Sequence, residues 1–260
     1  MKKAIKAACV AAVLAAVLLA AFAAASAQPG ITIDGDGVSI GLTDNPSDTA
    51  TAIQILLIIT VISLAPSIII MMTSFTRIVI VLSFLRNAMG TQQMPPNQVL
   101  IGFALFLSLF VMAPVVDRLY DEAYRPFVEQ EIDQDQALEN AAGVMKSYML
   151  SQFRSESKQE LSLFLSLAEI EAPAEPEDLP LSVVIPAFLL NELTIAFKFG
   201  FIIFIPFLVI DMVVASTLMS MGMMMLPPVM ISLPFKLLLF ISIDGWSLLT
   251  HELLKTFTMA

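Results

Sequence analysis

The sequence predicts an all-α membrane protein with two helical hairpins and a small helical domain between them. Of its 260 residues, 58% are hydrophobic, and the mean hydropathy of +0.86 lies far above that of a soluble globular domain. Two long apolar regions, residues 49–116 and 181–243, flank an acidic block at residues 117–182. Prolines and short polar segments interrupt the apolar regions, which divides each of them into a pair of helices.

Composition also excludes several kinds of function. The net charge of -10 argues against nucleic acid as a partner. The sequence has one cysteine, Cys9, and one histidine, His251, so neither disulfide chemistry nor a nucleophile with a histidine base is expected. No phosphate-binding G-x-x-x-x-G-K-[ST] motif occurs, which argues against an ATPase. We therefore expect no enzyme, no cofactor and no metal site.

The first 27 residues have the pattern of a secretory signal peptide. Three lysines precede an apolar run at residues 7–24, and Ala25-Ser26-Ala27 is a small-residue cleavage site. The mature protein is then expected to begin outside the cytoplasmic membrane of a bacterium. The alternative is an uncleaved first membrane helix. Residues 28–50, rich in small polar residues, are predicted to be an exposed leader with a short strand at 31–40.

Residues 51–119 are predicted to form the first helical pair. The uncharged run at residues 49–76 is long enough to cross a bilayer, and a second uncharged run covers residues 87–116. Arg77 and Arg86 lie between the runs, and no acidic residue accompanies them. A connection that carries only arginine is favoured on the cytoplasmic side, so we interpret both residues as cytoplasmic-side anchors.

Residues 120–182 are predicted to form an acidic helical domain on the extracytoplasmic side. Short helices are expected at residues 127–138 and 141–153, followed by an amphipathic helix at 158–170. The side chains predicted to face inward on that helix are Leu161, Phe164, Leu165 and Ala168. The acidic run is interpreted as a solvated face, with a catalytic pair of carboxylates as the alternative.

Residues 183–260 are predicted to form the second helical pair, in which four charges are embedded: Glu192, Lys198, Asp211 and Lys236. A charge near the centre of a bilayer costs about 2.5–3.5 kcal/mol, so each needs a protein or water partner from another helix or another subunit. We assign Glu192 and Asp211 to hydrogen bonds between subunits. For both lysines the alternative is that the side chain extends to a membrane interface.

Five prolines are expected to break this region repeatedly, and broken helices are tolerated at membrane depth only where protein or a water-filled cavity surrounds them. They are Pro186, Pro206, Pro227, Pro228 and Pro234. Helices packed into an oligomeric channel therefore fit the sequence better than single spans exposed to lipid.

A run of methionines separates the two apolar helices of this pair. Gly222 lies inside the run and Pro227-Pro228 closes it, which predicts a bent segment. Because the unbranched thioether repacks easily, we predict a deformable apolar seal, one copy per subunit, that closes a pore. The alternatives are ordinary lipid-facing or core residues and a thioether Cu(I) site. The predicted seal residues are Met219, Met221, Met223, Met224 and Met225.

Several ordered motifs now point to a family. They are Pro186-Ala-Phe-Leu-Leu-Asn-Glu-Leu193, Phe204-Ile-Pro-Phe-Leu-Val-Ile-Asp211, Met221-Gly-Met-Met-Met-Leu-Pro-Pro228, Leu233-Pro-Phe-Lys-Leu237 and Asp244-Gly-Trp246, together with Thr73-Ser-Phe-Thr-Arg-Ile78 and Gln92-Gln-Met-Pro-Pro-Asn97. From about residue 53 onward the chain resembles the FliP family of flagellar and type III export-gate proteins.

The resemblance implies a subunit of the export gate in the bacterial inner membrane, at the flagellar basal body. Several copies would associate with the small apolar proteins FliQ and FliR and work with the membrane proteins FlhA and FlhB. Unfolded rod, hook and filament proteins would pass through, and Met223, Met224 and Met225 would plug the pore. The family has a neutral polar residue where this chain has Lys198. The alternative is a small proton-coupled transporter that uses Glu192 and Asp211.

Overall fold

The computed structural model describes residues 59–60, 62–64, 67–68, 70–91, 93–153, 158–170, 176–223 and 227–258. The chain divides into two compact units, Met1–Ile69 and Ile70–Ala260, and the helices below belong to the second. Within the described residues the regular structure is helical and no strand occurs, as the all-α prediction required. The expected signal peptide (1–27), leader (28–50, with its strand) and half of the helix at 49–76 lie outside the described residues.

The first two described helices are α3 (Phe75–Met89) and α4 (Asn97–Leu119). Gly90 ends α3 in the left-handed conformation, and the two prolines before Asn97 form the turn into α4, as expected. The segment predicted to connect two spans is instead the body of α3. It holds no glycine or proline, and nothing in it stops a helix.

The acidic middle consists of a π-helical turn, η1 (Tyr120–Tyr124), and the helices α5 (Arg125–Val128), α6 (Gln134–Ser151) and α7 (Lys158–Leu167), before a short 3-10 turn, η3 (Pro176–Asp178). The predicted break between residues 138 and 141 is wrong. The chain turns at residues 129–133 instead, because the Asp133 side chain accepts a hydrogen bond from the Gln136 amide (2.8 Å) and starts α6 there.

The longest helix, α8 (Leu181–Ser220), has 40 residues and is followed by α9 (Pro228–Ser242) and α10 (Gly245–Leu254). The prediction of repeated breaks is wrong at Pro186, Pro206 and Pro234, which lie inside helices. Each proline removes a single backbone donor, and the long apolar segments on both sides keep the helix continuous. Pro227 and Pro228 do mark a boundary, since they begin α9.

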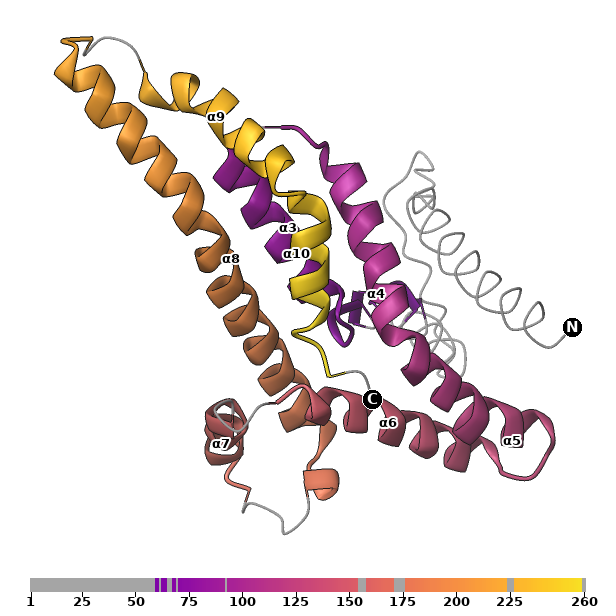
Figure 1. The fold of residues 1–260 in the computed structure, drawn as a ribbon. Coiled ribbons are helices and arrows are strands. Elements are labelled where there is room, and N and C mark those ends of the chain that lie inside the picture. Colours follow the sequence, from indigo (N-terminus) through magenta and orange to yellow (C-terminus); the bar gives the residue numbers. More distant parts are fainter. Residues whose placement is uncertain are drawn as a thin grey trace, which may run out of the picture. The chain divides into compact units, whose positions relative to one another are not determined.

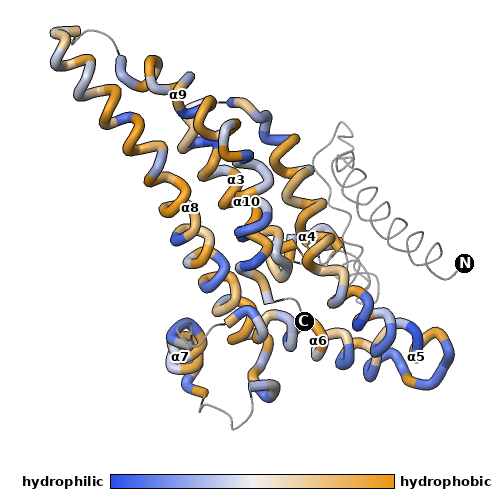
Figure 2. Tube along the Cα trace, in the orientation of Figure 1, coloured by the Kyte–Doolittle hydropathy of each residue, from blue (hydrophilic) through white to orange (hydrophobic). Residues whose placement is uncertain are grey.

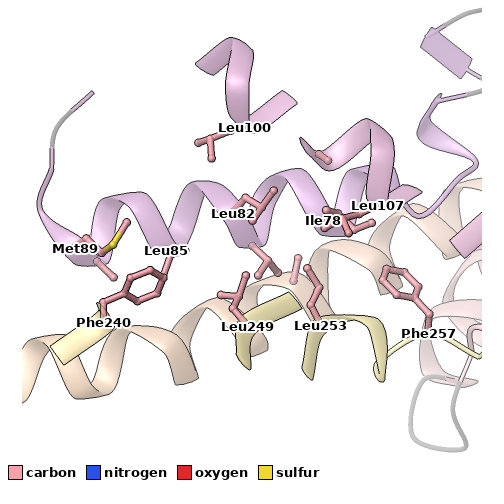
Figure 3. Close-up of a cluster of buried hydrophobic side chains, with 14 of the residues drawn as sticks. Ile78, Leu82, Leu85, Met89, Leu100, Leu107, Phe240, Leu249, Leu253 and Phe257 are labelled. Carbon is pink, nitrogen blue, oxygen red and sulfur yellow. The ribbon is translucent and has the colours of Figure 1, made fainter. Parts of the chain in front are cut away.

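Two hydrophobic clusters hold these helices together. The first, drawn in Figure 3, joins α3, α4, α8, α9 and α10 through fully buried side chains that include Ile78, Leu82, Leu85, Leu100 and Leu253. The second joins the far ends of α4 and α8 to α6, with Tyr148, Met149 and Phe188 at its centre. Helix α3 has its most extensive contact with α8 (Figure 1). Leu161 and Leu165 of α7 pack against the second cluster as predicted, whereas Ala168 is exposed.

Two stretches are long and apolar enough to cross a membrane: Asn97–Val128 and Leu181–Ser220. The pair Pro228–Ser242 and Gly245–Leu254 passes the same test together, with a bend of 66° between the two helices. Figure 2 shows apolar residues along α4, α8 and α9 and hydrophilic ones around α5. These helices support the prediction of a membrane protein.

Candidate functional site

The most buried charges of the molecule are Arg77 on α3 and Glu192 on α8, both with side chains 0% exposed. Arg77 Nε donates to Glu192 Oε2 (2.9 Å), and the Arg77 Nη2 group pairs with Oε1, so the contact is bidentate. This fork geometry is the strongest form of an arginine–carboxylate pair. The pair stabilises the packing of α3 on α8, and the loss of either partner would leave the other charge buried and unpaired.

The segment that follows α10 completes this ion pair. Arg77 Nη1 donates to the backbone carbonyl of Thr256 (2.9 Å) and to its hydroxyl (3.0 Å). The Phe257 ring lies over the guanidinium, with 4.1 Å from Cζ to the ring centroid. Three nitrogens of Arg77 are thus satisfied without water, which is what a fully buried arginine requires.

A second layer of polar contacts surrounds the pair. Gln152 and Thr258 exchange two hydrogen bonds (2.9 and 3.3 Å), and the Asn191 amide donates to the Gln152 carbonyl (3.3 Å). Burial raises the pKa of the neighbouring Tyr148 hydroxyl, and the negative charge of Glu192 raises it further. Residues from α3, α6, α8 and the segment after α10 therefore meet in one polar centre inside an apolar fold.

The other embedded pair joins α8 to α9 near the methionine turn. Lys236 Nζ donates to Asp211 Oδ2 (2.6 Å) and to the Ala88 carbonyl in the last turn of α3 (3.2 Å). The Ser232 hydroxyl donates to the other Asp211 oxygen. Lys236 is 5% exposed and Asp211 33% exposed, so this pair retains access to its surroundings on one side.

Glu192 and Asp211 both find counter-charges on other helices of the same chain, which is one of the two sources expected for the embedded charges. Their assignment to hydrogen bonds between subunits stays a prediction. The structure differs from the expected anchor role of Arg77, whose side chain points into the core and away from any surface. Arg86, the other expected anchor, donates to Asn97 Oδ1 and to the Pro95 carbonyl (3.4 Å) and so fastens the turn between α3 and α4.

The predicted seal lies in the turn between α8 and α9, at the end of α8 in Figure 1. Met219, Met221 and Met223 are 63%, 64% and 43% exposed, while Met224 and Met225 lie outside the described residues. Gly222 adopts φ +75°, a left-handed conformation that glycine reaches without strain, and it turns the chain out of α8. The three described methionine side chains are thus all exposed within this chain.

Lys198 lies in the middle of α8 with its side chain exposed. No hydrogen bond or ion pair forms on it within the described residues. Beyond it, α8 and α9 leave an open apolar groove of about 480 Å³. The groove is lined by Val209, Ile210, Val213, Val214, Thr217, Leu218, Ile231 and Phe235.

The sequence analysis identified the four embedded charges. It did not predict that Arg77, Gln152 and Phe257 belong to the polar centre around Glu192. Only Arg77 carried a signal, as an unpaired cation beside an apolar run. The described residues contain no cluster of three or more metal-ligand side chains. The arrangement offers two internal ion pairs, an exposed methionine turn and an uncovered apolar surface.

Comparisons with known proteins agree on one family. The FliP family model matches residues 58–253. The Flagellar biosynthetic protein FliP of Bacillus subtilis (strain 168) is 51% identical over 220 residues, covering 85% of this chain and 98% of that protein. The protein of the same name from Pectobacterium carotovorum subsp. carotovorum is 52% identical over 206 residues, or 79% of each chain. The one from Aquifex aeolicus (strain VF5) is 47% identical over 208 residues, or 79% of this chain and 86% of that protein. The chain therefore belongs to the FliP family and is a membrane component of flagellar biosynthesis.

Proposed function

We propose that this chain is a pore-forming subunit of the flagellar type III export gate, which conducts unfolded rod, hook and filament proteins across the inner membrane. The observation that carries the proposal is the uncovered apolar surface formed by the second half of α8, α9 and their methionine turn. Large side chains such as Phe201, Ile202 and Met212 are 64–69% exposed along it. A contiguous apolar surface of this kind marks a site of protein or membrane contact.

Several copies of the chain, side by side, would cover this surface and enclose a lumen that a single copy cannot form. The small apolar proteins FliQ and FliR are proposed as further neighbours, and FlhA and FlhB as other membrane proteins of the export apparatus. The two ion pairs support this assembly indirectly. Because they neutralise Glu192, Asp211 and Lys236 inside each subunit, the surface that remains between subunits is mostly apolar, and Lys198 is the embedded charge that stays exposed on it.

The methionine turn is proposed as the seal of the lumen. An apolar constriction blocks ions by excluding water. Methionine side chains are flexible enough to close around a passing polypeptide, which limits leakage during transport. The exposure of Met219, Met221 and Met223 within the subunit leaves them available for this contact.

The experiment replaces Met223, Met224 and Met225 with alanine and measures ion leakage and protein secretion in cells. We expect increased leakage with secretion retained. The matched control is Met212→Ala, since Met212 is as exposed (65%) but lies on the shaft of α8. Unchanged leakage in the triple variant, or equal leakage in the control, would refute the seal.

The transporter alternative is not favoured by the geometry. Glu192 and Asp211 are 19 positions apart on one helix, or about 28 Å at 1.5 Å per residue. Each carboxylate is occupied by its own cation on a different helix. A proton relay requires neighbouring groups that exchange protons. The mass of the gently solubilised complex also separates the two functions, because a pore subunit forms a larger assembly than a monomeric or dimeric transporter.

A further inference from the structure

Lys198 lies on the face of α8 opposite its buried residues. Successive residues of an α-helix are 100° apart, and Ala196, Gly200 and Phe207 define the buried face of α8. Lys198 lies about 200° from Ala196 and therefore on the opposite face. Its neighbours there, Phe201 and Ile202, are apolar and exposed. A lone cation in such a surface is costly unless an anion meets it from outside the chain.

Among the described residues, Asp244 is an acidic residue that, like Lys198, is exposed and unpaired. It lies between α9 and α10, exposed, with a left-handed backbone (φ 50°). Its backbone amide bonds to Ile241, but no hydrogen bond or ion pair forms on its carboxylate within the described part of the chain. The left-handed backbone explains why a short polar residue occupies position 244. Asparagine would fit there equally well, so the backbone does not explain the negative charge.

The carboxylate lies over a shallow depression lined by Ile243, Asp244, Ser247, Leu248 and His251. The nearest cationic candidate there, His251, is already occupied by Glu252 (3.3 Å). Two of its exposed neighbours, Ile243 and Leu248, are apolar, whereas Ser247 and His251 are polar. Like Lys198, this charge has no partner among the described residues of its own chain.

The two charges lie at similar heights along the helices. The rings of Phe207 on α8 and Phe240 on α9 are 6.5 Å apart, which sets these residues at one level, and the two helices run in opposite directions. Lys198 precedes Phe207 by nine residues and Asp244 follows Phe240 by four. At 1.5 Å per residue they lie about 14 and 6 Å below that level. The long lysine side chain covers most of the remaining offset of about 8 Å.

We propose that Lys198 of one copy forms an ion pair with Asp244 of a neighbouring copy, which fixes the register between adjacent subunits. The proposal rests on the proposed assembly of several copies. A lipid phosphate could satisfy Lys198, but it would leave Asp244 unpaired. A second copy satisfies both charges with one contact, and complementary charges are a common device for setting register between subunits.

The first test is cross-linking of the full chain in membranes, with Cys9 replaced by serine. In the variant Lys198→Cys and Asp244→Cys, a thiol-specific cross-linker long enough to span the offset of about 8 Å should produce dimers and a ladder of larger species. Each single-cysteine variant should stay monomeric on a denaturing gel. Lys198→Cys with Glu139→Cys, an exposed position on α6, is the matched control and should not form a ladder. A ladder in the control alone, or in neither pair, contradicts the proposed contact.

The second test is a double-variant cycle on assembly. Lys198→Gln and Asp244→Asn each remove one charge, and asparagine tolerates the left-handed backbone at position 244. Each single variant should lower the association constant of the complex by about two- to five-fold, as expected for a partly solvated ion pair. The double variant should be no weaker than either single one, and Lys198→Arg should assemble normally.

The outcomes separate this inference from the proposed function. Additive losses, or no losses, in a complex of unchanged size overturn the ion pair and leave the pore subunit intact. A loss for Lys198→Gln that depends on anionic lipid in reconstituted vesicles, with Asp244→Asn unaffected, overturns the ion pair in favour of a lipid phosphate. A monomeric wild-type chain overturns both.

Discussion

The two halves of α8 differ in what covers them. Of the nine buried residues in this helix, only Phe207 lies beyond Gly200. The first half packs against α3, α6 and α7 and holds the fully buried Glu192. By contrast, the stretch of 18 residues that makes α8 apolar enough to span a membrane is only 6% buried. At 40 residues, α8 is about 60 Å long, roughly twice the thickness of a bilayer core.

The difference shows that one continuous helix serves two purposes. Its first half is packed within the chain, where Arg77 pairs with Glu192 and the Gln152 carbonyl accepts a hydrogen bond from the Asn191 side chain. Its second half packs against α9 through Phe207 and Phe240 but leaves most of its side chains exposed, so it depends on contacts from outside the chain. We therefore expect changes in the first half to affect folding and changes in the second half to affect assembly and leakage.

The largest effect is expected at Glu192. Glu192→Ala leaves the Arg77 guanidinium buried without its counter-charge, which should lower the free energy of unfolding by about 3–5 kcal/mol. Denaturant unfolding of the detergent-solubilised chain at fixed concentration measures this loss. The double variant Arg77→Met and Glu192→Leu replaces both charges with apolar groups and should recover most of it. A double variant as unstable as the single one would show that the charge itself is not the cause.

A smaller loss is expected at the Asp211–Lys236 pair, because Asp211 is one-third exposed. Asp211→Asn keeps the contact with Ser232 but removes the charge that faces Lys236. We expect a loss of about 1.5–3 kcal/mol, typical of a hydrogen bond to a charged group. The same unfolding measurement applies. A loss larger than that of Glu192→Ala would reverse the comparison between the two halves of α8.

The close approach of α3 and α8 predicts a comparable or slightly smaller effect at Gly200. A Cβ atom there would lie 2.6 Å from the Phe84 ring, so Gly200→Ala should cost about 1–3 kcal/mol through overpacking. Gly102→Ala on α4 is the control, since nothing lies within 4 Å of its added methyl group, and it should be neutral or slightly stabilising. Equal losses in both variants would point to a general intolerance of alanine.

The smallest effect on folding is expected in the methionine turn. Met219→Ser and Met221→Ser change side chains that are more than 60% exposed, so stability should stay within about 0.5 kcal/mol of the unaltered chain. Ion leakage measured in the same variants should rise. Destabilisation without leakage would place these residues in the core of the subunit and contradict their assignment to the seal.

Hydrophobicity and charge patterns were sufficient for the fold class and for the embedded charges. The all-helical structure and the apolar stretches at α4 and α8 follow directly from uncharged runs in the sequence. Helix boundaries were less predictable where one side chain decides them. The Asp133 cap starts α6 several residues before the expected break, and Pro186 and Pro206 do not end α8.

The pairing of Arg77 with Glu192 could not be predicted, because no local pattern connects residues so far apart. Spacing along one helix excluded Glu192–Lys198 as a pair but left every other cation open. The same limit applies to Phe257 and Gln152, whose contacts depend on how the segment after α10 crosses α3 and α6. Tertiary packing alone decides such contacts.

The distance in sequence between Arg77 and its partners has a consequence for biogenesis. Glu192 is made 115 residues after Arg77, and Thr256 179 residues after it. Until α8 has been made, the guanidinium of α3 lacks the carboxylate that it pairs with in the folded chain, and burying it unpaired is costly. Translation order therefore postpones the final docking of α3 until α8 has emerged, although α3 precedes α8 in the chain.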